Sequence, residues 1–186
     1  MLNSILSIPL KHIKKLEFFQ ALAPGSKEKL LGQISLITFE LGQQIAAPGV
    51  ISGRVLILLQ GQVRLIVDDQ EGLHSFGKFE VGSVLGAASL LCGVGLDNLI
   101  ASSSVLAASI SDELWAEYYA NDASFRSWCD NQLWPSEIIH VCKSIQQCFY
   151  KDSLDYIFDF VYNFVGTCHY IVQEVISNGL VVKIGV

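Results

Sequence analysis

Apolar and polar residues repeat with two different periods along this chain, and the change of period marks its organisation. Residues 8–23 carry apolar side chains every three to four positions, which predicts a helix. Pro24-Gly25 ends that helix, because both residues disfavour its continuation. Ser26 is a good N-cap residue and predicts a second, short helix at 27–33. The first part of the chain is therefore expected to be helical.

From residue 35 the period shortens to the two-residue alternation of β-strands. The clearest local signal is a hairpin, in which the β-rich runs 54–59 and 62–67 flank the turn Gln60-Gly61. The other predicted strands are 36–40, 43–47, 73–79 and 99–110. Short strands separated by glycine turns favour a sandwich or barrel over βαβ units.

One stretch between the strands differs from the rest. Residues 84–92 are apolar and rich in small side chains, and they predict a short helix that begins through Gly86, followed by a loop at 93–98. After Ile110 the helical pattern returns, with Ser111 as a cap. The predicted C-terminal elements are helices at 112–120, 121–131, 136–149 and 153–176 and a strand at 180–184. Because nothing follows this last strand, we expect the chain to be a fragment or a truncated product.

These elements predict a mainly β fold with flanking helices, and the resemblance described below implies a double-stranded β-roll or jelly roll of about eight strands. We expect three segments in one compact domain with an extension. Residues 1–34 form the N-terminal helical segment, 35–111 the β-roll, and 112–186 the C-terminal helical segment.

The composition indicates a folded protein with little polar surface. Of the 186 residues, 51% are hydrophobic and only 16% are charged, which excludes intrinsic disorder. We therefore expect some apolar surface to be covered by a partner or by further chain. The formal net charge of −6 argues against a general nucleic-acid binder, because an acidic chain repels phosphate backbones.

The cysteine pattern and the sequence motifs for targeting predict where the protein is located and whether its thiols are reduced. Its five cysteines are an odd number without a C-x-x-C pair, and the start of the chain has no secretory signal. Charged residues or glycines interrupt the apolar stretches 83–110 and 154–172, so neither predicts a membrane span. We expect a cytoplasmic protein with buried thiols. A zinc site is the alternative, although no ligand pair has finger-like spacing.

Several segments, in order, resemble the cyclic nucleotide-binding domain family, an eight-stranded β-roll flanked by helices. The segments that carry the resemblance are 16–22, FELGQQI at 39–45, SGRVLILLQGQVRLIV at 52–67, GSVLGAASLL at 82–91, 100–110 and Trp115. They span roughly residues 10–128, and residues 82–91 resemble the family's phosphate-binding cassette. This segment is called the cassette below.

Within that family, the phrases RVLILLQGQVRL, LGAASLLCG and IASSSVLA are similar to the N-terminal regulatory domain of cyanobacterial peptidase-containing ABC exporters. In such exporters the domain precedes a peptidase, a membrane domain and an ATPase. The resemblance implies other domains or subunits of an ABC exporter as partners, and contact with a membrane only through that transporter. A homodimer through helices between 112 and 149 is a further hypothesis.

The resemblance also implies the chemistry of the cassette. Family members hold the cyclic phosphate with N–H groups of the short helix and an arginine, while a glutamate accepts the ribose hydroxyl. Here Ala87 stands at the glutamate position, the arginine position falls near Asn98 or Leu99, and no Lys, Arg or His occurs between Phe79 and Phe125. Asp97 would oppose an anion. The candidate ligand-binding residues of this degenerate cassette are Gly82, Leu85, Gly86, Ala87, Ala88, Ser89, Asn98, Ala101 and Ser102. The structural alternative is a tight glycine turn that packs a small-residue helix onto the roll.

The sequence offers little support for a catalytic site or a metal site. It has no G-x-S-x-G motif, and His74 is alone on the strands, where a cupin-like metal site needs several histidines. We therefore expect no enzyme, no cofactor and no metal, but a regulatory or sensor domain with a degenerate cassette. The alternatives are a genuine sensor of cAMP, cGMP or another small ligand, and the effector domain of a transcription regulator without its DNA-binding module.

Overall fold

A computed structural model describes residues 11–69 and 72–149 of the chain. The chain divides into two compact units, residues 1–132 and 133–186. The predicted helix at 153–176 and strand at 180–184 lie outside the described residues. Among the described residues, no helix combines the length and the apolar character that a membrane span requires.

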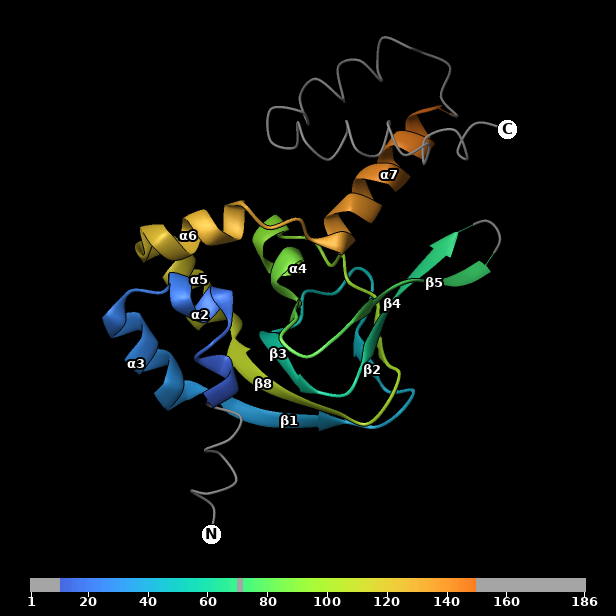
Figure 1. Cartoon of the computed structure of the whole chain (residues 1–186). Helices are drawn as coiled ribbons and strands as arrows, with labels where there is room; N and C mark the ends of the chain where they lie inside the picture. The colour runs from blue at the N-terminus through green and yellow to red at the C-terminus, as the bar shows by residue number, and fades with distance from the viewer. Residues whose placement is uncertain (1–10, 70–71, 150–186) are drawn as a thin grey trace. The chain divides into compact units, whose positions relative to one another are not determined.

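The first unit contains two antiparallel sheets of four strands each (Figure 1). The first sheet has the order β1 (Ser35–Phe39), β8 (Val105–Ser111), β3 (Arg54–Gln60) and β6 (Val84–Leu85). The second has the order β2 (Gln44–Ala46), β7 (Leu99–Ala101), β4 (Val63–Asp69) and β5 (Gly72–Phe79). This arrangement confirms the predicted fold class. β6 is an addition, because its two residues fell inside the predicted short helix.

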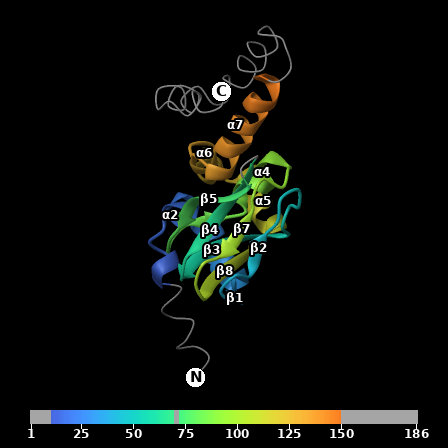
Figure 2. The same ribbon diagram turned by 90° about the vertical axis from the view of Figure 1, so that its right-hand side faces the viewer.

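The core is deepest at the two central strands of the first sheet. β3 buries four consecutive residues, Val55 to Leu58, and β8 buries Ala107 to Ile110. A run of this kind needs cover on both faces of a sheet. Helix α5 (Asp112–Asn121) contacts both strands. The second sheet adds buried residues such as Val63 and Leu65 to the same core. In the turned view of Figure 2, the strands of both sheets lie at the centre of this unit.

The hairpin predicted at Gly61 is present and is held by a second turn. Gly61 has a φ of +89°, and a Cβ built on it would lie 2.2 Å from the backbone oxygen of Ser104. The Gln62 N–H donates to Ser103 Oγ at 2.9 Å. The predicted continuous strand at 99–110 is therefore wrong, because its serines form the turn between β7 and β8 and use their hydroxyls on the neighbouring hairpin.

The N-terminal helices also differ from the prediction. The single helix expected at 8–23 is interrupted by a turn at 14–16, and α2 covers Glu17–Ala21. The next helix, α3, covers Pro24–Gln33, so Ser26 lies inside it rather than at its cap. Proline suits the first helical position, because its missing N–H would have no helical partner there.

Helices α5, α6 (Ala123–Asp130) and α7 (Pro135–Phe149) follow β8. Ser111 caps α5 as predicted, with Oγ accepting from the Leu114 N–H at 3.3 Å. Asp122 caps α6 by accepting from the Phe125 N–H at 3.2 Å, and its second oxygen accepts from the Ala23 N–H at 2.7 Å. Burial opposes ionisation of Asp122, but these hydrogen bonds outweigh it and lower its pKa. One carboxylate thus joins the start of α3 to the start of α6.

An aromatic cluster joins α2, α5 and α6. The Trp115 side chain is fully buried, and its ring lies 5.9 Å from Phe18 and 4.9 Å from Phe125, measured between centroids. Trp128 completes the cluster at 6.0 Å from Phe125. Rings at these separations contribute about 0.5–1.5 kcal/mol per pair beyond their buried area. Helices α2, α5 and α6 therefore share one aromatic core.

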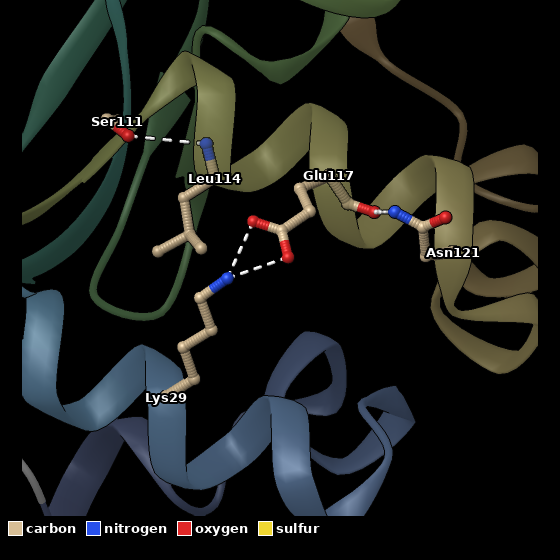
Figure 3. A network of polar contacts seen from close by, with 5 residues as sticks. All are labelled: Lys29, Ser111, Leu114, Glu117 and Asn121. Carbon is tan, nitrogen blue, oxygen red and sulfur yellow. Dashed lines mark hydrogen bonds and ion pairs between the residues drawn. The ribbon is translucent and has the colours of Figure 1, made fainter.

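An exposed ion pair joins α3 to α5 (Figure 3). Lys29 Nζ lies 2.7 Å from both carboxylate oxygens of Glu117. The two side chains are 41% and 49% exposed, and pairs in water contribute only about 0–1 kcal/mol. Figure 3 also shows the Ser111 cap and the Asn121 side chain on the Glu117 carbonyl. Most of the attachment of α3 therefore comes from buried residues such as Leu30.

Candidate functional site

The candidate site is built where β6 passes into the short helix α4 (Ala87–Cys92). Leu85 pairs with Leu56 of β3, which fixes the direction of the chain as it leaves the sheet. Gly86 then adopts a φ of +86°, and a Cβ there would lie 3.1 Å from the Arg54 oxygen. The glycine is required for both its positive φ and its close approach to the strand. α4 therefore begins at a fixed point against β3.

Ser89 and Asp97 form a buried polar pair beneath this helix. Their side chains are 2% and 4% exposed, and Ser89 Oγ donates to Asp97 Oδ2 at 2.6 Å. The same Oγ accepts the N–H groups of Leu96 at 2.9 Å and Asp97 at 3.1 Å. One hydroxyl thus uses its donor and both acceptor positions. It fastens the loop at 93–98, called the cassette loop below, onto α4.

The cassette loop also packs directly against the turn that follows β2. The Gly49 N–H donates to the Gly95 oxygen at 2.8 Å. A Cβ built on Gly95 would lie only 2.1 Å from the Val50 nitrogen, so the backbone of the cassette loop packs directly on the backbone of the turn. Beside this contact the side chains of Val50 and Val94 are exposed. The loop is therefore held from two sides, by Ser89 and by the turn.

Comparison with known proteins gives a fold but no relative. No protein-family model matches the chain, and no curated protein matches it significantly. Solved structures do match. The regulatory subunit of a cAMP-independent protein kinase A from Trypanosoma brucei aligns with a TM-score of 0.60 and 19% identity, over 72% of this chain and 49% of that one. This chain thus spans about half the length of that subunit.

Three further structures agree. A triple mutant of the same subunit, which includes a threonine-to-arginine change and is bound to cAMP, aligns at a TM-score of 0.58 and 18% identity over 74% of this chain and 53% of that one. A cyclic nucleotide-binding-like protein from Brucella abortus aligns at 0.51 and 16%, over 62% and 100%. The sensor domain of the transcriptional regulator DNR from Pseudomonas aeruginosa aligns at 0.54 and 13%, over 63% and 84%.

The fold is that of cyclic nucleotide-binding domains. The segment predicted from the sequence as the cassette, residues 82–91, forms the turn before β6, β6 itself and most of α4. The structure gathers Leu85, Gly86, Ala87, Ala88 and Ser89 there, all of them buried. Burial is nearly complete even for Ala87 and Ala88, which are 1% and 3% exposed. The side chains of Leu85, Ala87, Ala88 and Ser89 therefore face the protein interior.

The other predicted site residues lie in separate places. Gly82 is in the turn before β6, where a Cβ would meet Leu16 at 3.2 Å. Asn98 ends the cassette loop, and its Oδ1 lies 3.5 Å from Gln44 Nε2. Ala101 belongs to β7 opposite Val63, and the N–H and hydroxyl of Ser102 both donate to the Gln62 oxygen.

The Ser89–Asp97 pair is the feature that sequence reasoning missed. From the sequence, Asp97 is only a charge that opposes an anion, and Ser89 is only one of the candidate ligand-binding residues. The available signal was an acidic residue in a mostly apolar loop, which does not identify its partner. Lys78, the cation nearest in sequence, is exposed on β5 opposite Arg64. The cassette and its loop therefore combine a buried acid, Asp97, with a lack of nearby basic residues in the sequence.

Proposed function

We propose that this chain is a non-catalytic regulatory domain of the cyclic nucleotide-binding fold whose cassette no longer binds the cyclic phosphate. The domain would respond to contact with other protein parts. The observation that carries the proposal is the buried Ser89–Asp97 hydrogen bond at 2.6 Å. It places the carboxylate of Asp97, from the cassette loop, against the cassette residue Ser89 and leaves the Ser89 hydroxyl fully used.

Electrostatics explain why this arrangement disfavours the ligand. A cyclic nucleotide carries one negative charge on its phosphate. Two like charges about 5 Å apart repel by about 3 kcal/mol at an effective dielectric constant of about 20. The sequence supplies no Lys, Arg or His between Phe79 and Phe125 to reverse that sign. Helix α4 contributes only six residues, so its dipole offers little compensation.

The matching structures support a regulatory fold without nucleotide response. The trypanosome subunit is described as cAMP-independent, and the form of it bound to cAMP carries an introduced arginine. We propose that the charges around the cassette likewise decide whether this chain binds a nucleotide.

For the larger setting we propose the cytosolic regulatory part of an ABC exporter. The support is the sequence similarity of the hairpin, the cassette and the closing strand to that group. In this setting the partners are the peptidase, membrane or ATPase parts of the transporter. A signal would pass through β8 into α5, because Ser111 ends the strand and caps the helix that packs against β3 and β8.

Calorimetric titration with cAMP and cGMP tests the loss of binding. We compare the unmodified chain with Asp97→Asn, which removes the buried charge and keeps an oxygen for the Ser89 hydroxyl. Glu80→Gln is the matched control, because it removes one charge from an exposed turn before the cassette. We expect no heat of binding for the unmodified chain and the control, and weak binding for Asp97→Asn.

Micromolar binding by the unmodified chain would overturn the proposal and establish a genuine nucleotide sensor. Equal weak binding by all three proteins would show that Asp97 does not exclude the ligand. Binding by none of them would contradict the electrostatic explanation, and would leave the buried small side chains as the reason for the lost site.

A further inference from the structure

We propose that the open edge of the second sheet, strand β5, binds an extended acidic segment of another protein, which adds to the four strands as a further one. This goes beyond the loss of nucleotide binding and does not depend on it, so the two proposals can fail separately. Two independent observations support it. One is a row of outward-facing side chains that carries positive charge without an acid, and the other is the edge of β5 itself.

The charged row crosses the whole second sheet. Gln44 of β2 lies opposite Ile100 of β7. Ile100 lies opposite Arg64 of β4, and Arg64 lies opposite Lys78 of β5. Residues directly opposite one another share a face of the sheet. This is the outer face, because Arg64 and Lys78 are exposed while the residues on either side of Arg64 in β4 are buried. The four residues are called the basic row below.

The two cations of the basic row lie side by side without a counter-charge. Like charges directly opposite each other destabilise a sheet. Within the described ranges 11–69 and 72–149, no ion pair joins Arg64 or Lys78 to an acidic side chain. Such a pair does form elsewhere, between Lys29 and Glu117. The basic row therefore carries charge that an added acid would neutralise, and it ends with Lys78 at the edge of the sheet.

Strand β5 forms that edge. In the part of the chain that the structure describes, it pairs with β4 alone and is the last strand of its sheet. Figure 1 shows the hairpin of β4 and β5 on the side of the first unit away from α2 and α3. An edge strand presents a row of N–H and C=O groups that is a template for a further strand. A polypeptide can match these groups in register, whereas a nucleic acid or a lipid surface cannot.

Apolar side chains extend along the same edge. Leu73 is 71% exposed and Phe76 is 50% exposed. Phe76 is the extra residue of a bulge, because the pairing with β4 passes from Gly77 to Ser75 and skips it. Bulges at sheet edges re-aim a side chain. Here the bulge leaves an exposed aromatic ring two positions from Lys78, so the edge offers apolar contact beside positive charge.

The charges decide which strand fits this edge. β5 contains His74 and Lys78 but no Asp or Glu, so a second copy of β5 would bring no acid to the basic row. A lysine on an edge strand also disfavours the pairing of identical strands. A segment with Asp or Glu opposite Lys78 would instead continue the basic row with the missing charge. The edge therefore fits an acidic segment better than a second copy.

Fluorescence anisotropy of labelled peptides, measured with the full chain, tests this assignment. The probe is a peptide of alternating valine and glutamate. One control peptide alternates valine and lysine, and the other is the glutamate peptide with methylated backbone nitrogens. We expect saturable binding of the probe below about 1 mM and none of the controls, because strand addition needs both the acid and the N–H groups.

Variants of the chain test the basic row. Arg64→Gln and Lys78→Gln together should weaken binding about tenfold, since an exposed ion pair contributes about threefold for each charge. Arg64→Lys with Lys78→Arg keeps the charge and should keep binding. Lys11→Gln and Lys14→Gln together are the matched control, because they remove the same charge from exposed positions outside the sheet. In urea denaturation, the Arg64 and Lys78 glutamine double should have a higher midpoint than the unmodified chain, because the repulsion between the two strands is gone.

Several results would overturn the proposal. These are absence of binding by the glutamate peptide, equal binding of either control peptide, equal loss in the two glutamine doubles, or loss in the charge-keeping double. A lower urea midpoint in the Arg64 and Lys78 glutamine double would contradict the repulsion between these residues. Binding of oligouridylate without binding of the glutamate peptide would identify a nucleic acid as the partner instead. A dimer that Phe76→Ser dissociates would identify a second copy.

Discussion

Removing the hydroxyl of Ser89 should destabilise the first unit far more than an ordinary serine substitution. Ser89→Ala leaves the N–H groups of Leu96 and Asp97 without the hydroxyl that accepts them, and it removes one hydrogen bond from the buried Asp97 carboxylate. Each unsatisfied buried group costs about 1–3 kcal/mol. Because the Leu96 N–H is only partly buried, we expect a total loss of about 3–5 kcal/mol.

A double-mutant cycle isolates the Ser89–Asp97 contact from the other effects. Its members are the unmodified chain, Ser89→Ala, Asp97→Ala and the double variant. A hydrogen bond to a charged group contributes about 1.5–3 kcal/mol, so we expect a coupling energy of that size. Urea denaturation followed by tryptophan fluorescence measures each free energy of unfolding, since Trp115 lies in the core of the same unit.

Ser104→Ala is the control, because that side chain is exposed and should change stability by less than about 0.5 kcal/mol. The reasoning is refuted if Ser89→Ala costs no more than this control. It also fails if the two single effects add to within about 0.5 kcal/mol, because independent residues would behave in that way.

Three further predictions concern the scaffold. Gly95→Ala should lower the free energy of unfolding by more than about 1 kcal/mol, because the new Cβ would lie 2.1 Å from a backbone atom. Gly32→Ala, where a Cβ would have no neighbour within 4 Å, should raise the free energy of unfolding by about 0.5–1 kcal/mol. Denaturant melts measure both changes. Because the folded state lowers the pKa of Asp122, its ionised carboxylate stabilises the fold fully above the unfolded pKa of about 3.9. The loss of unfolding free energy in Asp122→Asn should therefore shrink as pH falls through the folded pKa. A loss that stays constant from about pH 6 to pH 2 would contradict this. Burial raises the pKa of Cys129 to about 12, so iodoacetamide at about pH 8 should label this thiol only after denaturation. Mass spectrometry measures the labelling. Faster labelling of Cys129 than of the exposed Cys92 would contradict the packing of α6.

Local patterns predicted the β-roll well because its signals are local. The Gly61 hairpin and the Ser111 cap depend on residues that are adjacent in sequence, and both are present. The turn at 102–104 was missed for the opposite reason. Its serines look like weak strand residues until the neighbouring hairpin supplies Gln62, whose backbone they bind. Tertiary contacts decide whether such a segment forms a strand or a turn, and the periodicity of the sequence does not reveal those contacts.

The candidate site shows the same limit. Small residues after a glycine identified the β6–α4 connection, because only such residues allow a helix to approach a strand so closely. The Ser89–Asp97 pair could not be predicted from spacing, since a loop of unknown path separates its members. The split of the first helix at 14–16 was equally hidden, because the apolar period continues across a turn that Ile13 and Leu16 anchor.

Amide chemical shifts offer the most direct test of the central claim, that the cassette no longer binds a cyclic nucleotide. A ¹⁵N-labelled sample is titrated with cAMP and then with cGMP to millimolar concentration. We predict no saturable shift for the amides of Ala87, Ala88, Leu96 and Asp97. Saturable shifts confined to these amides would show that a nucleotide enters, and would contradict the account.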